Sequence, residues 1–280
     1  MPGLGVPVSP ALICRTDVEV SDFERAVSMI NVDGVWKTTR KSRQQLTDGL
    51  ILEYANTLGS ASLLEIGASC GIASLELLEQ VGTACSRFFL TDRYLAIPYK
   101  RVGAVTYLYH PGDKRCIMAI GPFWIAYEDC AGCLPGLGAL AGELLAKCPA
   151  LNDPGGCGLA SLVHPTVRER ACTDKRVSLL EHDMWRPWSF GEVDAVKIAN
   201  VLNKAYFGAE RLRAALRNVV ACAKIGGRVF LADNRTEERV TVLDRIGIDC
   251  VRIAKVLNGG AEVIGAATQA SNVPGEVVSL

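Results

Sequence analysis

The chain has 280 residues, of which 49% are apolar, and its 30 basic and 30 acidic side chains give a formal net charge of zero. This length and composition predict one substantial core, in one domain with an elaboration. The balanced charge and the lack of a long basic run disfavour electrostatic capture of nucleic acid. No uncharged stretch reaches the roughly 20 residues of a membrane span. Eleven cysteines without a recognisable export signal favour reduced thiols in the cytoplasm.

Residues 1–60 predict an N-terminal helical segment, and residues 61–280 predict one larger domain. A capping-box pattern, Ser-Asp-Phe-Glu at residues 21–24, predicts the start of a first short amphipathic helix. Residues 31–42 are polar and predict a loop. A second helix is expected to end at Gly59 and to carry on one face the apolar side chains that recur at helical spacing, namely Leu46, Leu50, Tyr54 and Leu58.

Residues 63–78 predict a buried strand, a tight glycine turn and a helix, which is the opening of an α/β nucleotide-type site. Glycines in such a turn let the backbone approach a ligand closely, and the helix N-terminus offers free N–H groups. The dinucleotide fingerprint G-x-G-x-x-G fits poorly, because Ser69 and Ile72 stand where its second and third glycines belong. A different family therefore has to explain the turn.

Two families remain for this turn. Residues 67–71, Gly-Ala-Ser-Cys-Gly, satisfy the G-x-S-x-G nucleophile elbow of α/β hydrolases, with Ser69 as the nucleophile. With Glu65 included, the segment reads E-x-G-x-S-x-G. It then resembles the first motif of class I S-adenosylmethionine-dependent methyltransferases, usually E/D-x-G-x-G-x-G, with Ser69 in place of the middle glycine.

A second buried strand is predicted to end at Asp92, roughly twenty residues beyond the glycine turn. A carboxylate at this place suits a ribose diol, because two hydroxyl donors meet one acceptor group. This feature fits methyltransferases and dehydrogenases, whereas a hydrolase elbow gives no reason for it.

Residues 97–173 form a long insertion where a simple fold has one connecting helix. Within it, residues 105–109 and 116–127 predict a β-hairpin, and residues 137–145 predict a helix. Loops of this length in a compact domain are usually functional, so we expect the insertion to select the substrate.

The cysteines of the insertion include one pair with metal-like spacing, Cys130 and Cys133. No second such pair follows at the distance of a zinc ribbon, so we predict free thiols and no metal site.

The segments after the insertion resemble the later motifs of class I methyltransferases, in the family's order. They predict a third strand, a fourth strand with a polar end, a helix, and a fifth strand after a glycine pair, at residues 177–181, 193–203, 209–223 and 224–233. Two apolar runs joined by an Asn-Gly turn, residues 250–257 and 261–268, predict a terminal antiparallel hairpin. The methyltransferase sheet has such a hairpin, and an ordinary dinucleotide fold lacks it.

The resemblance predicts an α/β fold with a Rossmann-like, mostly parallel sheet flanked by helices. A C-terminal antiparallel hairpin and an inserted β-hairpin and helical segment between strands 2 and 3 complete it. It implies transfer of the methyl group of S-adenosylmethionine to an acceptor that the motifs do not identify, where the protein mainly aligns and desolvates the reactants. The neutral charge and the apolar insertion favour a small-molecule acceptor. The alternatives are an α/β hydrolase with Ser69 as nucleophile, weakened because no histidine follows His182, and a non-catalytic S-adenosylmethionine-binding module.

The resemblance also implies site residues. Asp183 is expected to accept a hydrogen bond from the adenine amino group, with the backbone of Met184 beside the ring. The candidate catalytic residues are Asn203, Tyr206 and His182, although Asn203 equally suits a cap of the next helix and His182 a backbone-satisfied role. The full cofactor-binding set is Glu65, Gly67, Ala68, Ser69, Gly71, Asp92, Arg93, Asp183, Met184 and Asn200.

Overall fold

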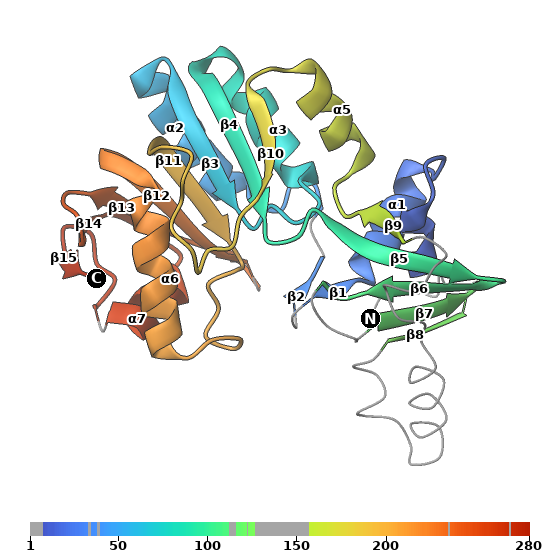
Figure 1. Ribbon diagram of the computed structural model, residues 1–280. Helices are drawn as coiled ribbons and strands as arrows, with labels where there is room; N and C mark the ends of the chain where they lie inside the picture. Colours follow the sequence, from blue (N-terminus) through green and yellow to red (C-terminus); the bar gives the residue numbers. More distant parts are fainter. Residues whose placement is uncertain are drawn as a thin grey trace. The chain divides into compact units, whose positions relative to one another are not determined.

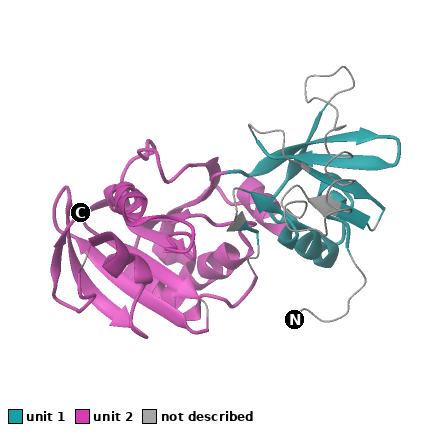
Figure 2. Ribbon diagram, turned by 90° about the horizontal axis from the view of Figure 1, so that it is seen from below, with its two compact units in different colours: residues 1–38, 94–165 teal, residues 39–93, 166–280 magenta. Residues whose placement is uncertain are grey.

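The structure is a computed structural model, and it describes residues 8–32, 35–37, 40–111, 116–121, 123–126, 157–234, 236–268 and 270–280. The chain divides into two compact units (Figure 2). Unit 1 comprises residues 1–38 and 94–165, and unit 2 comprises residues 39–93 and 166–280.

Unit 2 is built on an eight-stranded sheet whose first five strands are parallel (Figure 1). They lie in the order β10-β4-β3-β11-β12. Counted along the chain, this is third, second, first, fourth, fifth, the order of a doubly wound nucleotide-binding sheet, and it reverses direction between β3 and β11. The five strands are β3 (Ala61–Ile66), β4 (Cys85–Asp92), β10 (Val177–Glu181), β11 (Val193–Ala199) and β12 (Ala223–Asn234).

Three antiparallel strands extend this sheet beyond β12, namely β13 (Glu238–Arg245), β14 (Cys250–Leu257) and β15 (Val277–Ser279). An antiparallel strand thus holds the sixth position, where a dinucleotide-binding fold has another parallel strand. The predicted fold class, a Rossmann-like and mostly parallel sheet with antiparallel strands at its C-terminal end, is confirmed.

The prediction of a second strand in the terminal hairpin is wrong, because residues 262–268 form a helix, α7 (Glu262–Thr268). Its buried side chains, Val263, Ile264 and Ala267, follow helical spacing and pack into the core. The Asp233 carboxylate accepts a hydrogen bond from the Glu262 N–H at 2.7 Å and caps the helix. The hairpins of this region are formed instead by β12, β13 and β14.

Helices cover both faces of the sheet in unit 2. Helices α6 (Ala209–Ala221) and α7 pack on one face, where the core includes Leu64 and Ile198. Helix α2 (Gln45–Leu58) covers the other face, and its Tyr54 ring lies 6.1 Å from the ring of Phe230 on β12. Helix α3 (Ile72–Val81) contacts α2, a 3-10 turn (Gly82–Ala84) leads into β4, and α5 (Pro165–Thr173) precedes β10.

Helix α2 ends at Gly59, with φ +70°, as predicted, but its buried face is not the expected one. Leu46 and Leu58 are 43% and 44% exposed, whereas Asp48 and Ile51 are buried. The reason is electrostatic. Asp48 forms an ion pair with Lys197 on β11, so the side of helix α2 that carries Asp48 faces the sheet.

The N-terminal region of unit 1 also differs from the prediction in detail. Helix α1 (Val20–Ser28) begins before Ser21 and has no side-chain cap, so the capping-box interpretation is wrong. Its amphipathic character is confirmed by the buried Phe23 and Val27. A 3-10 helix (Pro10–Cys14) precedes it, and the predicted loop contains a short antiparallel pair, β1 (Asn31–Val32) and β2 (Val35–Trp36).

Unit 1 contains a five-stranded antiparallel sheet in the order β8-β7-β6-β5-β9. The hairpin predicted in the insertion is confirmed as β6 (Val105–Tyr109) and β7 (Cys116–Ile120), but its second strand is shorter than expected. The chain turns at Gly121, with φ +54°, and returns as β8 (Phe123–Ala126); β5 (Ala96–Val102) and β9 (Gly158–Ser161) complete the sheet. The predicted helix at residues 137–145 and the pair Cys130 and Cys133 lie outside the described residues.

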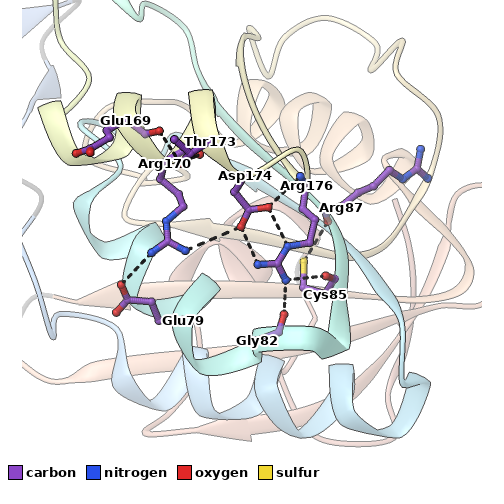
Figure 3. Close-up of polar contacts among 9 residues, drawn as sticks. All are labelled: Glu79, Gly82, Cys85, Arg87, Glu169, Arg170, Thr173, Asp174 and Arg176. Atoms are coloured by element: carbon purple, nitrogen blue, oxygen red, sulfur yellow. Dashed lines mark hydrogen bonds and ion pairs between the residues drawn. The ribbon is translucent and has the colours of Figure 1, made fainter.

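Polar contacts fix the amino ends of the parallel strands of unit 2 (Figure 3). The Arg176 guanidinium donates to the carbonyl oxygens of Gly82 and Cys85, at 2.5 and 3.2 Å, and to the Asp174 carboxylate. Arg170 forms ion pairs with Glu79 and Asp174. These contacts fasten the starts of β4 and β10 to the segments that lead into them.

No helix in the described part of the chain is long and apolar enough to cross a bilayer.

Candidate functional site

The predicted cofactor residues lie at the carboxyl edge of the parallel strands in unit 2. The glycine turn follows β3, Asp92 ends β4, Asp183 follows β10 and Asn200 follows β11. The strand order reverses between β3 and β11, and open α/β sheets bind ligands outside the carboxyl ends at such a switch point. The site predicted from the sequence is therefore at the place where this topology puts ligands.

The glycine turn has three residues in the left-handed region, Gly67, Ser69 and Gly71, with φ of +76°, +59° and +79°. A left-handed conformation is unusual for serine and accessible to glycine, the residue that stands at this position in the motif that residues 65–71 resemble. The N–H groups of Gly67 and Ala68 both donate to the Thr91 carbonyl at 2.9 Å, which ties the turn to β4.

Gly67 is required for a second reason, which differs from the expected one. A Cβ at this position would overlap the Val201 side chain, in the loop after β11. The space beside Gly67 is thus filled by a protein side chain, and close packing across the switch point demands the glycine.

Asp92 connects the turn with the neighbouring strand. Its carboxylate accepts a hydrogen bond from the Ser69 N–H at 2.8 Å, and its carbonyl oxygen accepts one from the His182 N–H at 2.9 Å. The carboxylate is buried beside the glycine turn.

The loop after β10 brings two predicted residues together. Arg93 Nε lies 3.5 Å from Asp183 Oδ2, and Asp183 Oδ1 accepts from the Trp185 N–H at 3.1 Å. Met184 is buried in the core, and its carbonyl oxygen accepts from the Asn218 side chain, so its side chain packs rather than faces solvent.

His182 is half-buried, and its ring meets the Trp188 ring edge to face, with 5.1 Å between the centroids. Burial lowers the pKa of His182, against the opposing effect of Asp183. The imidazole is therefore neutral at pH 7 and able to accept a proton.

The loop after β11 holds three further candidates, Asn200, Asn203 and Tyr206. Asn200 has φ +61°, and its side-chain oxygen accepts from the Asn234 N–H at 2.7 Å, which joins the ends of β11 and β12. The Asn203 side chain accepts from the Ala205 N–H at 2.8 Å and closes a local turn. The N-cap residue of α6 is Gly208, so the helix-cap alternative for Asn203 is wrong. Tyr206 is 49% exposed.

Glu65 has a setting that the sequence did not predict. It lies opposite Lys197 in the β3–β11 register, and the Lys197 ammonium is 3.3 Å from Glu65 Oε1 and 2.8 Å from Asp48 Oδ1. Burial raises the pKa of Asp48 to about 6, although Lys197 opposes this. Burial also disfavours the charge of Lys197, but the two carboxylates outweigh it and raise the pKa of Lys197. The available signal was a lysine in the middle of an apolar strand.

The hydroxyl of Ser69 has no hydrogen-bond partner among the described residues. A serine nucleophile needs a base within hydrogen-bonding distance.

No known family model and no curated protein matches this chain. Similar solved structures include the trans-methyltransferase CalH in complex with S-adenosylhomocysteine, with 14% identity, 79% of this chain and 44% of that chain covered, and a TM-score of 0.37. The N-methyltransferase NodS from Bradyrhizobium japonicum WM9, also in complex with S-adenosylhomocysteine, is 15% identical over 76% of this chain and 71% of that chain, with a TM-score of 0.33. The [4+2]-cyclase SpnF is 15% identical over 68% and 44% of the two chains, with a TM-score of 0.33.

This chain spans less than half of the CalH chain, and only 35% of the methyltransferase SibL. The Rossmann-like assignment rests on the strand order and strand directions of unit 2.

Proposed function

We propose that this chain is an S-adenosylmethionine-dependent methyltransferase that acts on a small-molecule acceptor. The observation that carries the proposal is the carboxyl edge of the switch point, where a strained glycine turn is hydrogen-bonded to a buried acid at the end of the next strand. Backbone strain of this kind is concentrated at ligand sites, because the surrounding structure has to maintain it.

The residues present fit the parts of the cofactor. The Asp92 carboxylate suits the two ribose hydroxyl groups as a hydrogen-bond acceptor. The ion-paired Asp183 and Arg93 side chains offer an acceptor and a donor for the adenine ring. Glu65 Oε2 is a buried acceptor without a hydrogen-bond partner among the described residues, so an N–H donor of the cofactor's amino-acid end would satisfy it. When bound, S-adenosylmethionine supplies a sulfonium methyl group that is ready for displacement.

The chain's own contribution to transfer is alignment of the acceptor and, where needed, removal of its proton. His182 is the group with a neutral imidazole, and Asn200, Asn203 and Tyr206 offer hydrogen bonds from the loop after β11. Replacing Asn200 or Tyr206 is expected to lower turnover more than the melting temperature. A large loss of melting temperature with normal activity per folded molecule would refute these roles.

The insertion at residues 97–173 is proposed to select the acceptor. Its described strands belong to unit 1 and so form an antiparallel sheet separate from the Rossmann-like sheet. Five described cysteines, Cys14, Cys85, Cys172, Cys222 and Cys250, are free thiols, which supports a reducing, cytoplasmic location.

The decisive test is calorimetric titration with S-adenosylhomocysteine. We expect the wild-type chain to bind it and Asp92→Ala to weaken binding by about 1–3 kcal/mol, because hydrogen bonds to a charged acceptor are lost. Asp174→Ala is the matched control, since this aspartate lies before β10, at the opposite edge of the sheet. No binding by the wild type would contradict the proposed function, and equal binding by Asp92→Ala would contradict the ribose assignment.

A further inference from the structure

The two strands that flank the switch point are joined by a buried ion pair. Glu65 on β3 and Lys197 on β11 are paired in the parallel register, so both side chains lie on the face of the sheet that α2 covers. Glu65 stands two residues before Gly67, the first residue of the turn. A single residue, Ile66, therefore separates the ion-paired Glu65 from the glycine turn.

Helix α2 completes this cluster through Asp48. Lys197 and Asp48 have side-chain exposures of 2% and 6%, and Glu65 has 5%, so all three charges are removed from water. The same end of α2 is held by Glu238 on β13, whose carboxylate accepts hydrogen bonds from the Leu46 and Thr47 N–H groups at 2.9 Å. The only described cation bonded to the two buried carboxylates is Lys197.

Such a cluster is costly to break. Two buried carboxylates that lose their shared ammonium become uncompensated buried charges. The Glu65 carboxylate also loses the ion pair at 3.3 Å that fixes its orientation. Lys197 thus fixes the position of the Glu65 carboxylate.

We propose that Lys197 is a positioning residue for the cofactor site, which holds the Glu65 carboxylate beneath the glycine turn and links it to helix α2 through Asp48. The inference rests on the proposed function and deepens it. The proposed function assigns Glu65 to the amino-acid end of the ligand, so Lys197 should affect binding of that end and leave the adenosine end at Asp92 and Asp183 unaffected.

The test compares two ligands, S-adenosylhomocysteine and 5′-methylthioadenosine, which keeps the adenosine part but lacks the amino-acid part. We expect Lys197→Met to weaken binding of S-adenosylhomocysteine about tenfold or more, as for the loss of a hydrogen bond to a charged group. Binding of 5′-methylthioadenosine should change less than about twofold. Lys224→Met is the matched control, because Lys224 forms an ion pair with Asp194 at 2.6 Å, at the amino edge of the sheet, and should change neither affinity.

Two further variants keep the test informative if Lys197→Met does not fold. Glu65→Gln preserves the shape of the side chain and should show the same selective loss, whereas Lys197→Arg keeps the charge and should retain most of the affinity for S-adenosylhomocysteine. Equal losses for the two ligands, or no loss for either, would overturn the role of Lys197. Failure of the wild type to bind both ligands would instead overturn the proposed function.

Discussion

The two edges of the parallel sheet in unit 2 contain similar charged residues, but the partners of these residues differ between the edges. At the amino edge, acids and bases satisfy one another and the backbone, as Asp174 and Arg176 do in Figure 3 and Asp194 does with Ser62 and Lys224. At the carboxyl edge, acids accept hydrogen bonds from turns that remain strained.

The positive φ values make the difference visible. The described residues include five non-glycine residues with positive φ, and two of them, Ser69 and Asn200, lie in the loops that flank the switch point. Strain is tolerated where a ligand needs a particular backbone shape, whereas an edge that only holds strands together has no use for it. We therefore expect carboxyl-edge changes to alter ligand binding, in some cases together with stability, and amino-edge changes to alter stability alone.

The largest effect is expected at Gly67. Gly67→Val combines a left-handed φ with overlap against Val201, so we expect a loss of more than about 3 kcal/mol of unfolding free energy, measured by urea denaturation. Gly67→Ala with Val201→Ala removes the overlap and should recover part of the loss seen in Gly67→Ala alone. No recovery would show that φ, rather than packing against Val201, requires the glycine.

Arg176→Ala should be the most damaging change at the amino edge. It leaves the carbonyl oxygens of Gly82 and Cys85 without their side-chain donor and removes the guanidinium from the Asp174 carboxylate, so we expect a loss of about 2–3 kcal/mol in stability. Affinity for S-adenosylhomocysteine per folded molecule should stay at the wild-type value. A selective loss of binding would abolish the distinction between the two edges.

The buried cluster and the amino edge should respond to pH with opposite signs. The raised pKa of Asp48, about 6, means that its contribution to stability is complete below pH 4 and is lost as the pH rises to about 6. The Arg176 guanidinium lowers the pKa of Asp174 to about 2, so that contribution is present above pH 4 and is lost as the pH falls towards 2.

Urea denaturation across this range checks both signs. Asp48→Asn should remove a fall of about 1–3 kcal/mol between pH 4 and 6, whereas Asp174→Asn should remove a fall on the acid side. Unchanged pH profiles in both variants would contradict the assigned ionisation states.

The smallest effects are expected at Ser69. Ser69→Gly relieves a left-handed φ and should raise stability by up to about 1 kcal/mol, with cofactor affinity retained. Ser69→Ala removes a hydroxyl that has no partner among the described residues and should have little effect on binding. Stoichiometric labelling by a serine-directed phosphonate, abolished by Ser69→Ala, would overturn the methyltransferase proposal in favour of the hydrolase.

The sequence by itself determined the parallel strands, the glycine turn and the carboxyl-edge position of the candidate residues. These signals are local, because buried strands read as apolar runs and a turn with three left-handed residues favours glycine, which it has at Gly67 and Gly71. The end of α2 at Gly59 was predictable for the same reason.

Only the tertiary structure decided which face of α2 is buried, that residues 262–268 form a helix, and that Glu65 is paired. Each depends on a partner distant in the chain: Asp48 turns inward because Lys197 is there, and α7 begins where Asp233 caps it. Apolar periodicity carries no information about a buried charge, because the free energy of burying Asp48 is set by an ammonium group on another strand.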